Sequence, residues 1–305
     1  MRIASHTAAQ AIQRALTDNR GALQKQQILV SNGNAYARRS EAPLDASEAS
    51  RVQQAQRRTQ QHLKAVENSD AWVLRTETEL TRVLDLTHRV NEISIRAGDA
   101  ALADDERHAL AEELDDLLED LVSGANAKSA QAYLFGGTDA GTPPVTVTRD
   151  ADGKIDSVAY STGSGTRRRV QVDDTTVAEY GSTATGAGGV FRNSGAGSDL
   201  FDTVIGLRDT IADGGVPTEV QSRAVVQALD GVTRGLAETG LQGARLEALR
   251  THHKEAGVRL EQQRSDLQDV DMAAAIGRLS ELEASLEASM RMAAAVNQLT
   301  LAKFI

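Results

Sequence analysis

The C-terminal third of the chain carries a heptad pattern of apolar residues, and this pattern limits the fold more than any other feature. From Leu246 to Val270 the candidate core positions recur in alternating steps of three and four residues. A second run, from Met272 to Val296, continues with nearly the same average spacing. Such a stripe covers one side of a helix, which must be buried against another helix. The sequence therefore predicts long packed helices rather than one compact globule.

A sparser stripe of the same kind lies at the N-terminus. Ile12, Leu16, Leu23 and Val30 follow one another in steps of four, seven and seven residues, and Asn19 occupies one of the gaps. Because the two stripes lie at opposite ends of the chain, they meet only if the chain folds back as a hairpin. A helix with so few apolar residues buries little area, so we expect it to be poorly ordered until something packs on it.

These two stripes are our candidate assembly site. We call the following residues the predicted seam: Ile12, Leu16, Leu23, Val30, Ile276, Leu279, Leu282, Leu286, Met290 and Val296.

The helical period disappears in the middle of the chain. Short β-branched runs, such as Val145–Val147 and Val170–Val172, alternate there with Gly-rich and Asp-Gly turn signals. The predicted fold class is thus mainly α, with an inserted small β domain and a long antiparallel helical rod built from N- and C-terminal segments. Since the insertion begins and ends in Gly-rich connections, we expect it to be separable from the helices.

The same pattern divides the chain into five segments. Residues 1–44 and 269–305 are the N- and C-terminal helices of an inner assembly domain, residues 45–140 and 198–268 are the two parts of the helical rod, and residues 141–197 are the small β domain.

Composition and motifs give no support to an enzyme. The chain has no Cys, and its six His lack the spacing of a helical metal site. No catalytic, cofactor-binding or metal-ligating residues are expected. The net charge of −10 argues against nucleic acid as a partner. No apolar run is long enough to cross a membrane, and residues 1–30 lack the pattern of a secretory signal peptide.

Charge is distributed unevenly along the chain. Residues 99–120 carry ten acidic residues and one base, while residues 1–60 are basic. Arg167, Arg168 and Arg169 form a basic run that we place at a strand edge or on a loop surface. We interpret the acidic segment 99–120 and the basic segment 1–60 as surfaces for other protein.

Several segments, taken in order, resemble a known family. They include Met1–Ser5, Ile28–Gly33, Arg107–Leu118, Tyr133–Gly137, Asp269–Ala273 and Asn297–Ile305. The chain resembles the flagellin superfamily, and Tyr-Leu-Phe-Gly-Gly at 133–137, followed by a short β region, is typical of its hook–filament junction proteins. The resemblance spans nearly the whole chain outside the β insertion.

The resemblance implies a structural role in the bacterial flagellum. A junction protein of this kind would assemble as a ring of identical copies between hook-associated protein 1 and flagellin. It would leave the cell through the flagellar type III export apparatus, with a dedicated export chaperone. Its location would be the extracellular flagellum, and it would carry no cofactor.

Two alternatives remain open from the sequence. The chain could be a flagellin, the subunit of the filament itself. It could instead be a secreted coiled-coil adhesin or effector that binds through the β insertion.

Overall fold

The computed structural model describes residues 2–186, 188–195 and 197–301, with side chains from residue 10 to residue 295 apart from the two gaps. Within these residues the long helices are α1 (Arg2–Asn32), α2 (Pro43–Ala97), α3 (Asp104–Ala125), α5 (Glu219–Gln268) and α6 (Met272–Leu301), and the shorter α4 is Leu200–Ala212. Two short 3₁₀ helices, η1 (Arg39–Glu41) and η2 (Thr162–Gly165), complete the helical elements.

The strands are short and lie between α3 and α4. They are β1 (Lys128–Ser129), β2 (Ala132–Tyr133), β3 (Val145–Arg149), β4 (Ile155–Tyr160), β5 (Arg168–Gln171), β6 (Val177–Tyr180), β7 (Thr185–Gly186), β8 (Arg192–Asn193) and β9 (Ser198–Asp199). β1 pairs with β2, β3 with β4 and β5 with β6, each time antiparallel. A separate three-stranded sheet has the order β7-β8-β9, in which β7 and β8 are parallel.

Local sequence accounts for several helix starts. Pro43 begins α2, where its missing N–H costs no intrahelical hydrogen bond. Asp199 caps α4 by accepting from the backbone N–H groups of Phe201 and Asp202. At the start of α5, the Thr218 hydroxyl accepts from the backbone N–H of Gln221 at 3.2 Å, and the Gln221 side-chain oxygen accepts from the backbone N–H of Thr218 at 2.9 Å.

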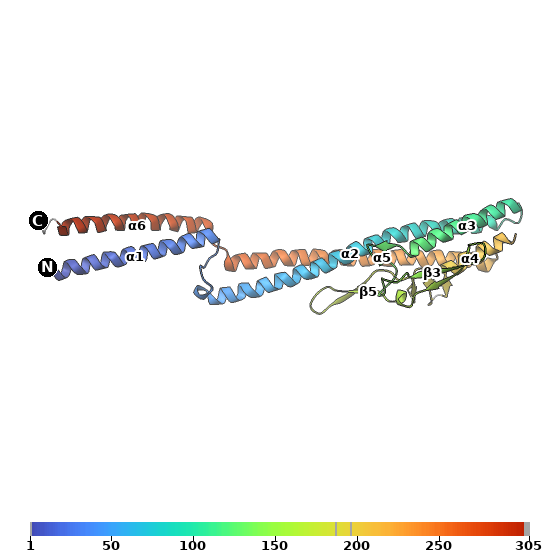
Figure 1. Cartoon of the computed structure of the whole chain (residues 1–305), viewed down its shortest axis with the longest axis horizontal. Coiled ribbons are helices and arrows are strands. Elements are labelled where there is room, and N and C mark those ends of the chain that lie inside the picture. The colour runs from blue at the N-terminus through green and yellow to red at the C-terminus, as the bar shows by residue number, and fades with distance from the viewer. Residues whose placement is uncertain (1, 187, 196, 302–305) are drawn as a thin grey trace. The chain divides into compact units, whose positions relative to one another are not determined.

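Contacts within the chain group the residues into two units. Unit 1 comprises residues 1–58 and 255–305, and unit 2 comprises residues 59–254. In unit 1, α1 and α6 run antiparallel side by side, with the N- and C-terminal ends of the chain at the same end of the pair (Figure 1). The class predicted from the sequence, mainly α with inserted β structure and paired terminal helices, is confirmed.

The core of unit 2 combines helices and β segments. Leucines of α3, among them Leu114, Leu118 and Leu121, are fully buried. They join a group of three aromatic rings, in which Phe191 lies 5.1 Å from Phe135 and 5.6 Å from Phe201 between ring centroids. Tyr133–Gly137 takes part through buried Phe135, and Gly137 has a positive φ of 60° that favours glycine.

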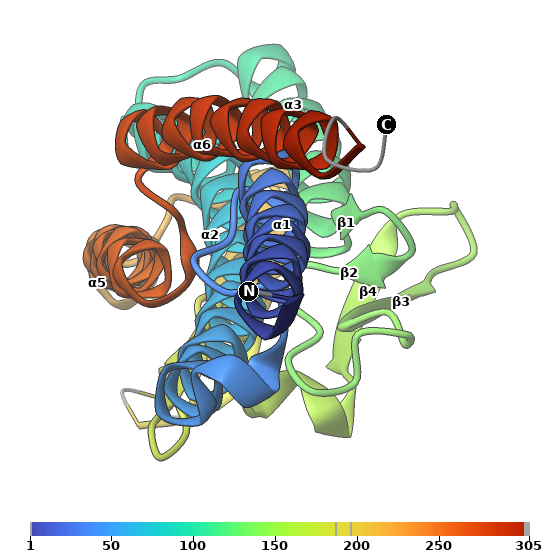
Figure 2. The ribbon, with the colours of Figure 1, turned by 90° about the vertical axis from the view of Figure 1, so that its left-hand side faces the viewer.

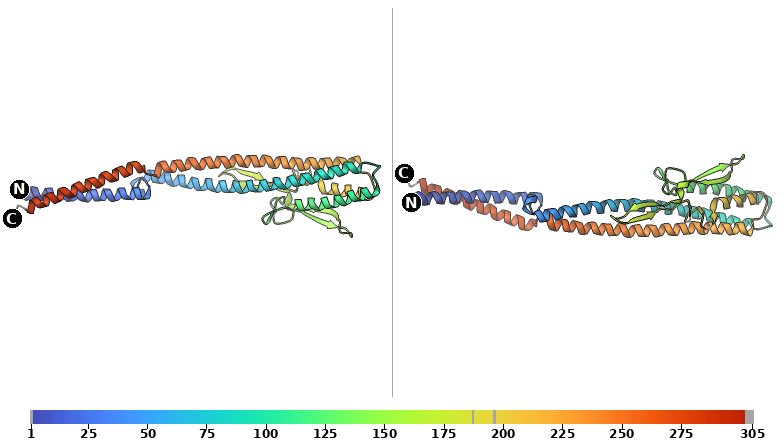
Figure 3. Two further views of the ribbon diagram at one scale, coloured as in Figure 1. Left: turned by 90° about the horizontal axis from the view of Figure 1, so that it is seen from above. Right: turned by 90° about the horizontal axis from the view of Figure 1, so that it is seen from below.

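A second, smaller cluster holds the β5–β6 hairpin against the helices. It contains Val66 and Val73 of α2, Val172 and Ala178 of the hairpin, and Leu246 of α5. Figure 3 shows the strands gathered beside the helices of unit 2, with α5 running along α2.

The structure differs from the expectation that the insertion is separable from the helices. Val145, Ile155, Val190 and Phe191 are buried in the same core as the helical leucines, so the segment is not a separable module. The domain boundaries predicted at residues 141 and 197 therefore enclose residues that share their core with α3, α4 and α5.

Candidate assembly surfaces

The contact between α1 and α6 is lined by half-buried side chains. On α1 these are Ile12, Leu16, Asn19, Leu23, Gln26, Leu29 and Val30. On α6 they are Leu279, Leu282, Leu286, Ser289 and Ala293, together with the buried Ala275. Both sets follow steps of three and four residues, which is the spacing of two helices that pack along a narrow stripe.

Polar side chains hold the register of this helix pair. The Asn19 amide nitrogen donates to the hydroxyl oxygens of Ser285 and Ser289, at 3.3 and 3.0 Å. Gln26 donates to the carbonyl oxygen of Ala275 at 2.9 Å. A polar residue within a helix–helix stripe lowers stability but favours one alignment over others.

The predicted seam is split by the structure. Ile12, Leu16, Leu23, Val30, Leu279, Leu282 and Leu286 lie between the two helices. Ile276 and Met290, in contrast, are 49% and 43% exposed, and Ala275 and Ser289 take the inner positions next to them. The side chain of Val296 lies outside the described residues.

The helix pair has almost no core of its own. Among the described side chains of α1 and α6, Ala275 alone is buried. Ile28, Met272, Ile276, Met290 and Met292 are each at least 43% exposed. Half-buried leucines and exposed methionines leave apolar area available for a further protein surface.

Two backbone hydrogen bonds form a short bridge between the segment that follows α1 and the segment that connects α5 to α6. Val270 donates its N–H to the carbonyl of Gly33 at 2.9 Å, and Ala35 donates to that of Gln268 at 2.8 Å. Gly33 has a φ of +69°, which favours glycine. The bridge fixes where α1 ends relative to the start of α6.

Charged side chains surround this bridge. Lys25 pairs with Glu41 at 3.0 Å, and its hydrogen bond lowers the pKa of the Glu41 carboxyl. Arg264 pairs with Glu261 and with Asp269, and its hydrogen bond to Glu261 lowers the pKa of that carboxyl. Asp271 then caps α6 by accepting from the N–H groups of Ala273 and Ala274.

Two histidines, His62 and His253, lie together in unit 2. His253 is buried and bonds the carbonyl oxygen of Val172 through Nε2 at 2.8 Å, and its ring stacks on that of His62. No group of three or more His, Asp or Glu that could hold a metal ion occurs in the described part of the chain. None of the helices described is long and apolar enough to span a membrane.

Comparison with known proteins gives a consistent family of matches. Residues 223–305 match the family model described as the bacterial flagellin C-terminal helical region. The chain is 25% identical over 308 aligned residues to flagellar hook-associated protein 3 of Escherichia coli, covering 95% of both proteins. It is 26% identical to flagellar hook-associated protein 3 of Salmonella typhimurium, covering 86% of both.

The resemblance to the flagellin superfamily, and within it to hook-associated protein 3, is confirmed. Solved structures agree at the level of the fold. A Vibrio parahaemolyticus protein described as a flagellar hook-associated protein is similar with a TM-score of 0.64 and 18% identity, covering 75% of this chain and all of that one. FlgL of Bacillus cereus is similar with a TM-score of 0.53 and 22% identity, covering 70% of this chain and 99% of that one.

Among the inner positions of the helix pair that the predicted seam left out are Asn19, Gln26, Ala275 and Ser289. Their signal was the heptad spacing itself. Asn19 stands midway between Leu16 and Leu23, and Ala275 and Ser289 are two heptads apart. Small and polar residues at such positions are easily passed over when apolar size alone selects the stripe.

Proposed function

We propose that this chain is a structural subunit of the bacterial flagellum that forms the junction between hook and filament. In this proposal several copies form a ring between hook-associated protein 1 and flagellin. The similarity to hook-associated protein 3 over 95% of the chain supports the junction role over that of a filament subunit. The flagellin C-terminal match over residues 223–305 is compatible with both roles, since it covers most of α5 and α6.

The observation that carries the proposal is the helix pair without a core. Burial of apolar side chains is what stabilises a helix of this length against its conformational entropy. In α1 and α6 the described leucines are half-buried, and Ile276 and Met290 face outward. Packing against neighbouring subunits would bury this remaining apolar area, so the terminal helices would complete their fold on assembly.

Export and location follow from the same proposal. A subunit of the outer flagellum has to leave the cell, and the flagellar export apparatus would carry it in unfolded form. An export chaperone would cover the apolar side of α6 that carries Ile276 and Met290, which are 49% and 43% exposed. Nothing in this role requires catalysis, so we propose a protein that is neither an enzyme nor dependent on a cofactor.

The test is deletion of the gene in the bacterium that encodes it, followed by electron microscopy of the cell surface. Cells without the protein should carry hooks that end without filaments, and the wild-type gene should restore the filaments. Full-length filaments in the deletion strain would overturn the junction role. Deletion of a filament subunit would also leave bare hooks. Labelling the protein in wild-type cells separates the two roles, because a filament subunit would be found along the whole filament.

A matched pair of variants then tests the terminal helices. Ile276→Asn changes an exposed apolar residue of α6, and Val177→Asn changes one on β6 that is 55% exposed. Both should leave the isolated protein folded, because neither side chain belongs to a buried core. The first variant should fail to restore filaments, while the second should restore them. Equal restoration by both would argue against assembly through the outer face of α6.

A further inference from the structure

The acidic helix α3 carries two groups of carboxylates. Glu113, Asp115 and Glu119 form ion pairs with Arg89, Arg208 and Arg149. On the face turned away from the core, Asp105, Glu112, Asp116 and Asp120 are exposed, and none of them forms an ion pair within the described residues. The buried leucines of α3 lie on the opposite side of the helix.

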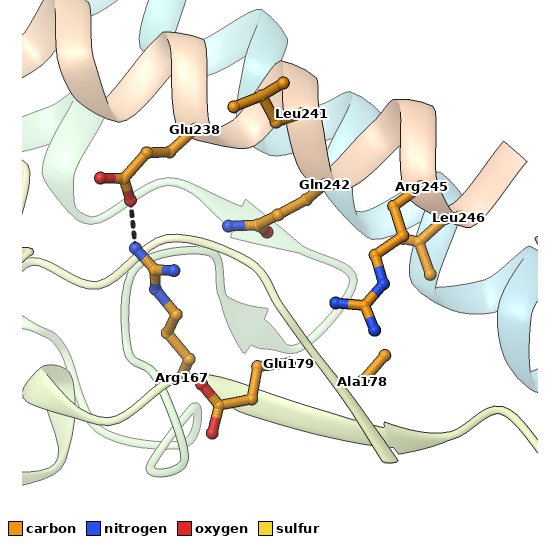
Figure 4. A pocket seen from close by; sticks show the side chains of 8 residues that line it. All are labelled: Arg167, Ala178, Glu179, Glu238, Leu241, Gln242, Arg245 and Leu246. Atoms are coloured by element: carbon orange, nitrogen blue, oxygen red, sulfur yellow. Dashed lines mark hydrogen bonds and ion pairs between the residues drawn. The ribbon is translucent and has the colours of Figure 1, made fainter. Parts of the chain in front are cut away.

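One flank of α5 carries the opposite charge. Arg234 and Arg245 are exposed and form no ion pair in the described part of the chain. Between them lie Glu238, which pairs with Arg167, and Leu241, which is 72% exposed. Figure 4 shows Arg167 reaching Glu238 from the β5–β6 side, and Arg245 extending from α5 toward Ala178.

A shallow groove of about 370 Å³ lies between α5 and the β5–β6 hairpin. Its lining includes Arg167, Glu238, Leu241 and Arg245, whereas Arg234 lies outside it on α5. The groove combines one free guanidinium, one paired guanidinium and an exposed leucine. A surface of this kind fits a partner that offers carboxylates and a small apolar side chain between them.

The acidic row and the basic flank share a spacing. Asp105 and Asp116 are 11 residues apart, as are Arg234 and Arg245. Eleven residues bring an α-helix back to almost the same side after about 16 Å. When the two helices are aligned antiparallel, with Arg234 beside Asp116 and Arg245 beside Asp105, the exposed Leu241 falls opposite the exposed Ala109. The same alignment brings Glu112 to the level of Glu238, where Arg167 can pair with both.

We propose that α3 of one copy of this chain docks antiparallel on the α5 flank formed by Arg234, Leu241 and Arg245 in a second copy. This inference rests on the proposed function, because it assigns a contact between neighbouring subunits of the ring. The occupant is a second copy because the chain itself supplies a carboxylate row of matching length and opposite charge.

The placement of the two surfaces suits a repeating contact. Figure 3 shows α3 and α5 on different sides of α2 within unit 2, so one copy could not use both surfaces on the same neighbour. A contact between two different patches joins subunits head to tail, which gives a closed ring or a helix rather than a two-fold dimer.

Cross-linking tests the contact directly, because the chain has no native cysteine. Ala109→Cys and Leu241→Cys, combined in one chain, should give disulfide-linked dimers and higher oligomers when intact flagella are oxidised. The matched control combines Ala109→Cys with Val226→Cys, since Val226 is an exposed α5 residue outside the Arg234–Arg245 flank. That control, and each single cysteine, should remain monomeric. A dimer from Leu241→Cys alone would overturn the head-to-tail contact, as would an equal ladder in the control.

Charge reversal tests the pairing of the residues. Arg234→Glu with Arg245→Glu should reduce the fraction of hooks that carry filaments. The two introduced carboxylates on α5 would then face the four exposed carboxylates of α3 in the neighbouring copy. Adding Asp105→Arg and Asp116→Arg to the same chain restores opposite charges and should recover most of that fraction. The pairing is wrong if the quadruple variant restores no more filaments than the double variant, although both have the wild-type melting temperature.

The two proposals fail in different ways. If the wild-type gene does not restore filaments to the deletion strain, the junction role fails. If it restores them but the Ala109–Leu241 cysteine pair, with filaments intact, gives no ladder, the junction role stands and the α3–α5 contact fails.

Discussion

The core of unit 2 and the helix pair α1–α6 show two ways of using a helical stripe. In unit 2, Leu114, Phe191 and Phe201 are at most 1% exposed, and they come from a helix, a loop and a second helix. In the α1–α6 pair, the described leucines stay half-buried and the inner row contains Asn19, Gln26 and Ser289. The first region has a third layer of β segments and short helices over its stripe, while the second has a single partner helix.

This difference predicts where stability resides. Unit 2 should fold cooperatively in the isolated protein, because its core is closed on all sides. The helix pair should contribute little to the stability of the monomer and much to assembly. Four substitutions test this division, in order of decreasing expected effect on monomer stability.

Phe191→Ala should have the largest effect. Phe191 is 1% exposed and touches two other aromatic rings, so its removal leaves a cavity at the centre of the core. A change of this kind costs about 3–5 kcal/mol, which lowers the melting temperature of a unit of this size by about 10 °C. Thermal unfolding followed by circular dichroism measures it, with Val177→Ala on the exposed side of β6 as the control. An unchanged melting temperature would mean that the β insertion is separable after all.

Arg208→Met should cause the second-largest loss of monomer stability. The Arg208 side chain is 6% exposed and donates to Asp115 at 2.9 Å and to the carbonyl oxygen of Ile155 at 2.7 Å. Methionine fills much of the space but leaves these acceptors with fewer donors, which costs about 1–3 kcal/mol. The control is Arg149→Met, whose guanidinium pairs with Glu119 at the surface and should contribute at most about 1 kcal/mol. Equal losses from both variants would contradict a special role for the buried pair.

Asp199→Asn should have a smaller, pH-dependent effect. Burial raises the pKa of the Asp199 carboxyl, against the hydrogen bond from Tyr160. A carboxyl whose pKa is higher in the folded state stabilises the fold most when it is protonated, and this stabilisation is lost as the pH rises through the folded pKa. Asparagine caps a helix as well and carries no charge. The urea midpoint of the variant should therefore gain on that of the wild type from pH 4 to pH 7, and a trend in the opposite direction would refute the argument.

The sequence predicted the parts of the fold that depend on local pattern. Val145–Val147 and Val170–Val172 were recognisable as strands because β-branched residues lay between turn signals. The pairing of the terminal helices followed from two stripes at opposite ends of the chain. These features can be predicted because they depend only on residues that are close in sequence or on one repeating spacing of apolar residues.

The remaining features depend on contacts that have no local period. Phe191 reaches the core from an irregular segment, and only the folded chain brings it beside Phe135 and Phe201. At the α1–α6 contact, apolar size favoured Ile276 and Met290, whereas close packing places the smaller Ala275 and Ser289 inside. The bridge from Val270 to Gly33 is made by backbone groups alone, so no pattern of side chains in the sequence predicts it.

Leu286→Ala should leave the melting temperature of the isolated protein unchanged, and this is the sharpest test of the comparison. Leu286 lies half-buried on the inner stripe of α6, next to Ser285 and Ser289, which bind Asn19. In a closed core a leucine-to-alanine change costs about 2–5 kcal/mol, but a residue that is only completed by assembly has no closed core to lose in the monomer. The matched variant is Leu246→Ala on α5, where the leucine is 2% exposed, and it should lower the melting temperature. In cells Leu286→Ala should have the larger effect on assembly. It should leave hooks without filaments at a temperature where both variant monomers are folded. If Leu286→Ala instead melts the monomer as strongly as Leu246→Ala does, then the terminal helices already share in the stability of the isolated subunit, and assembly does not complete their fold.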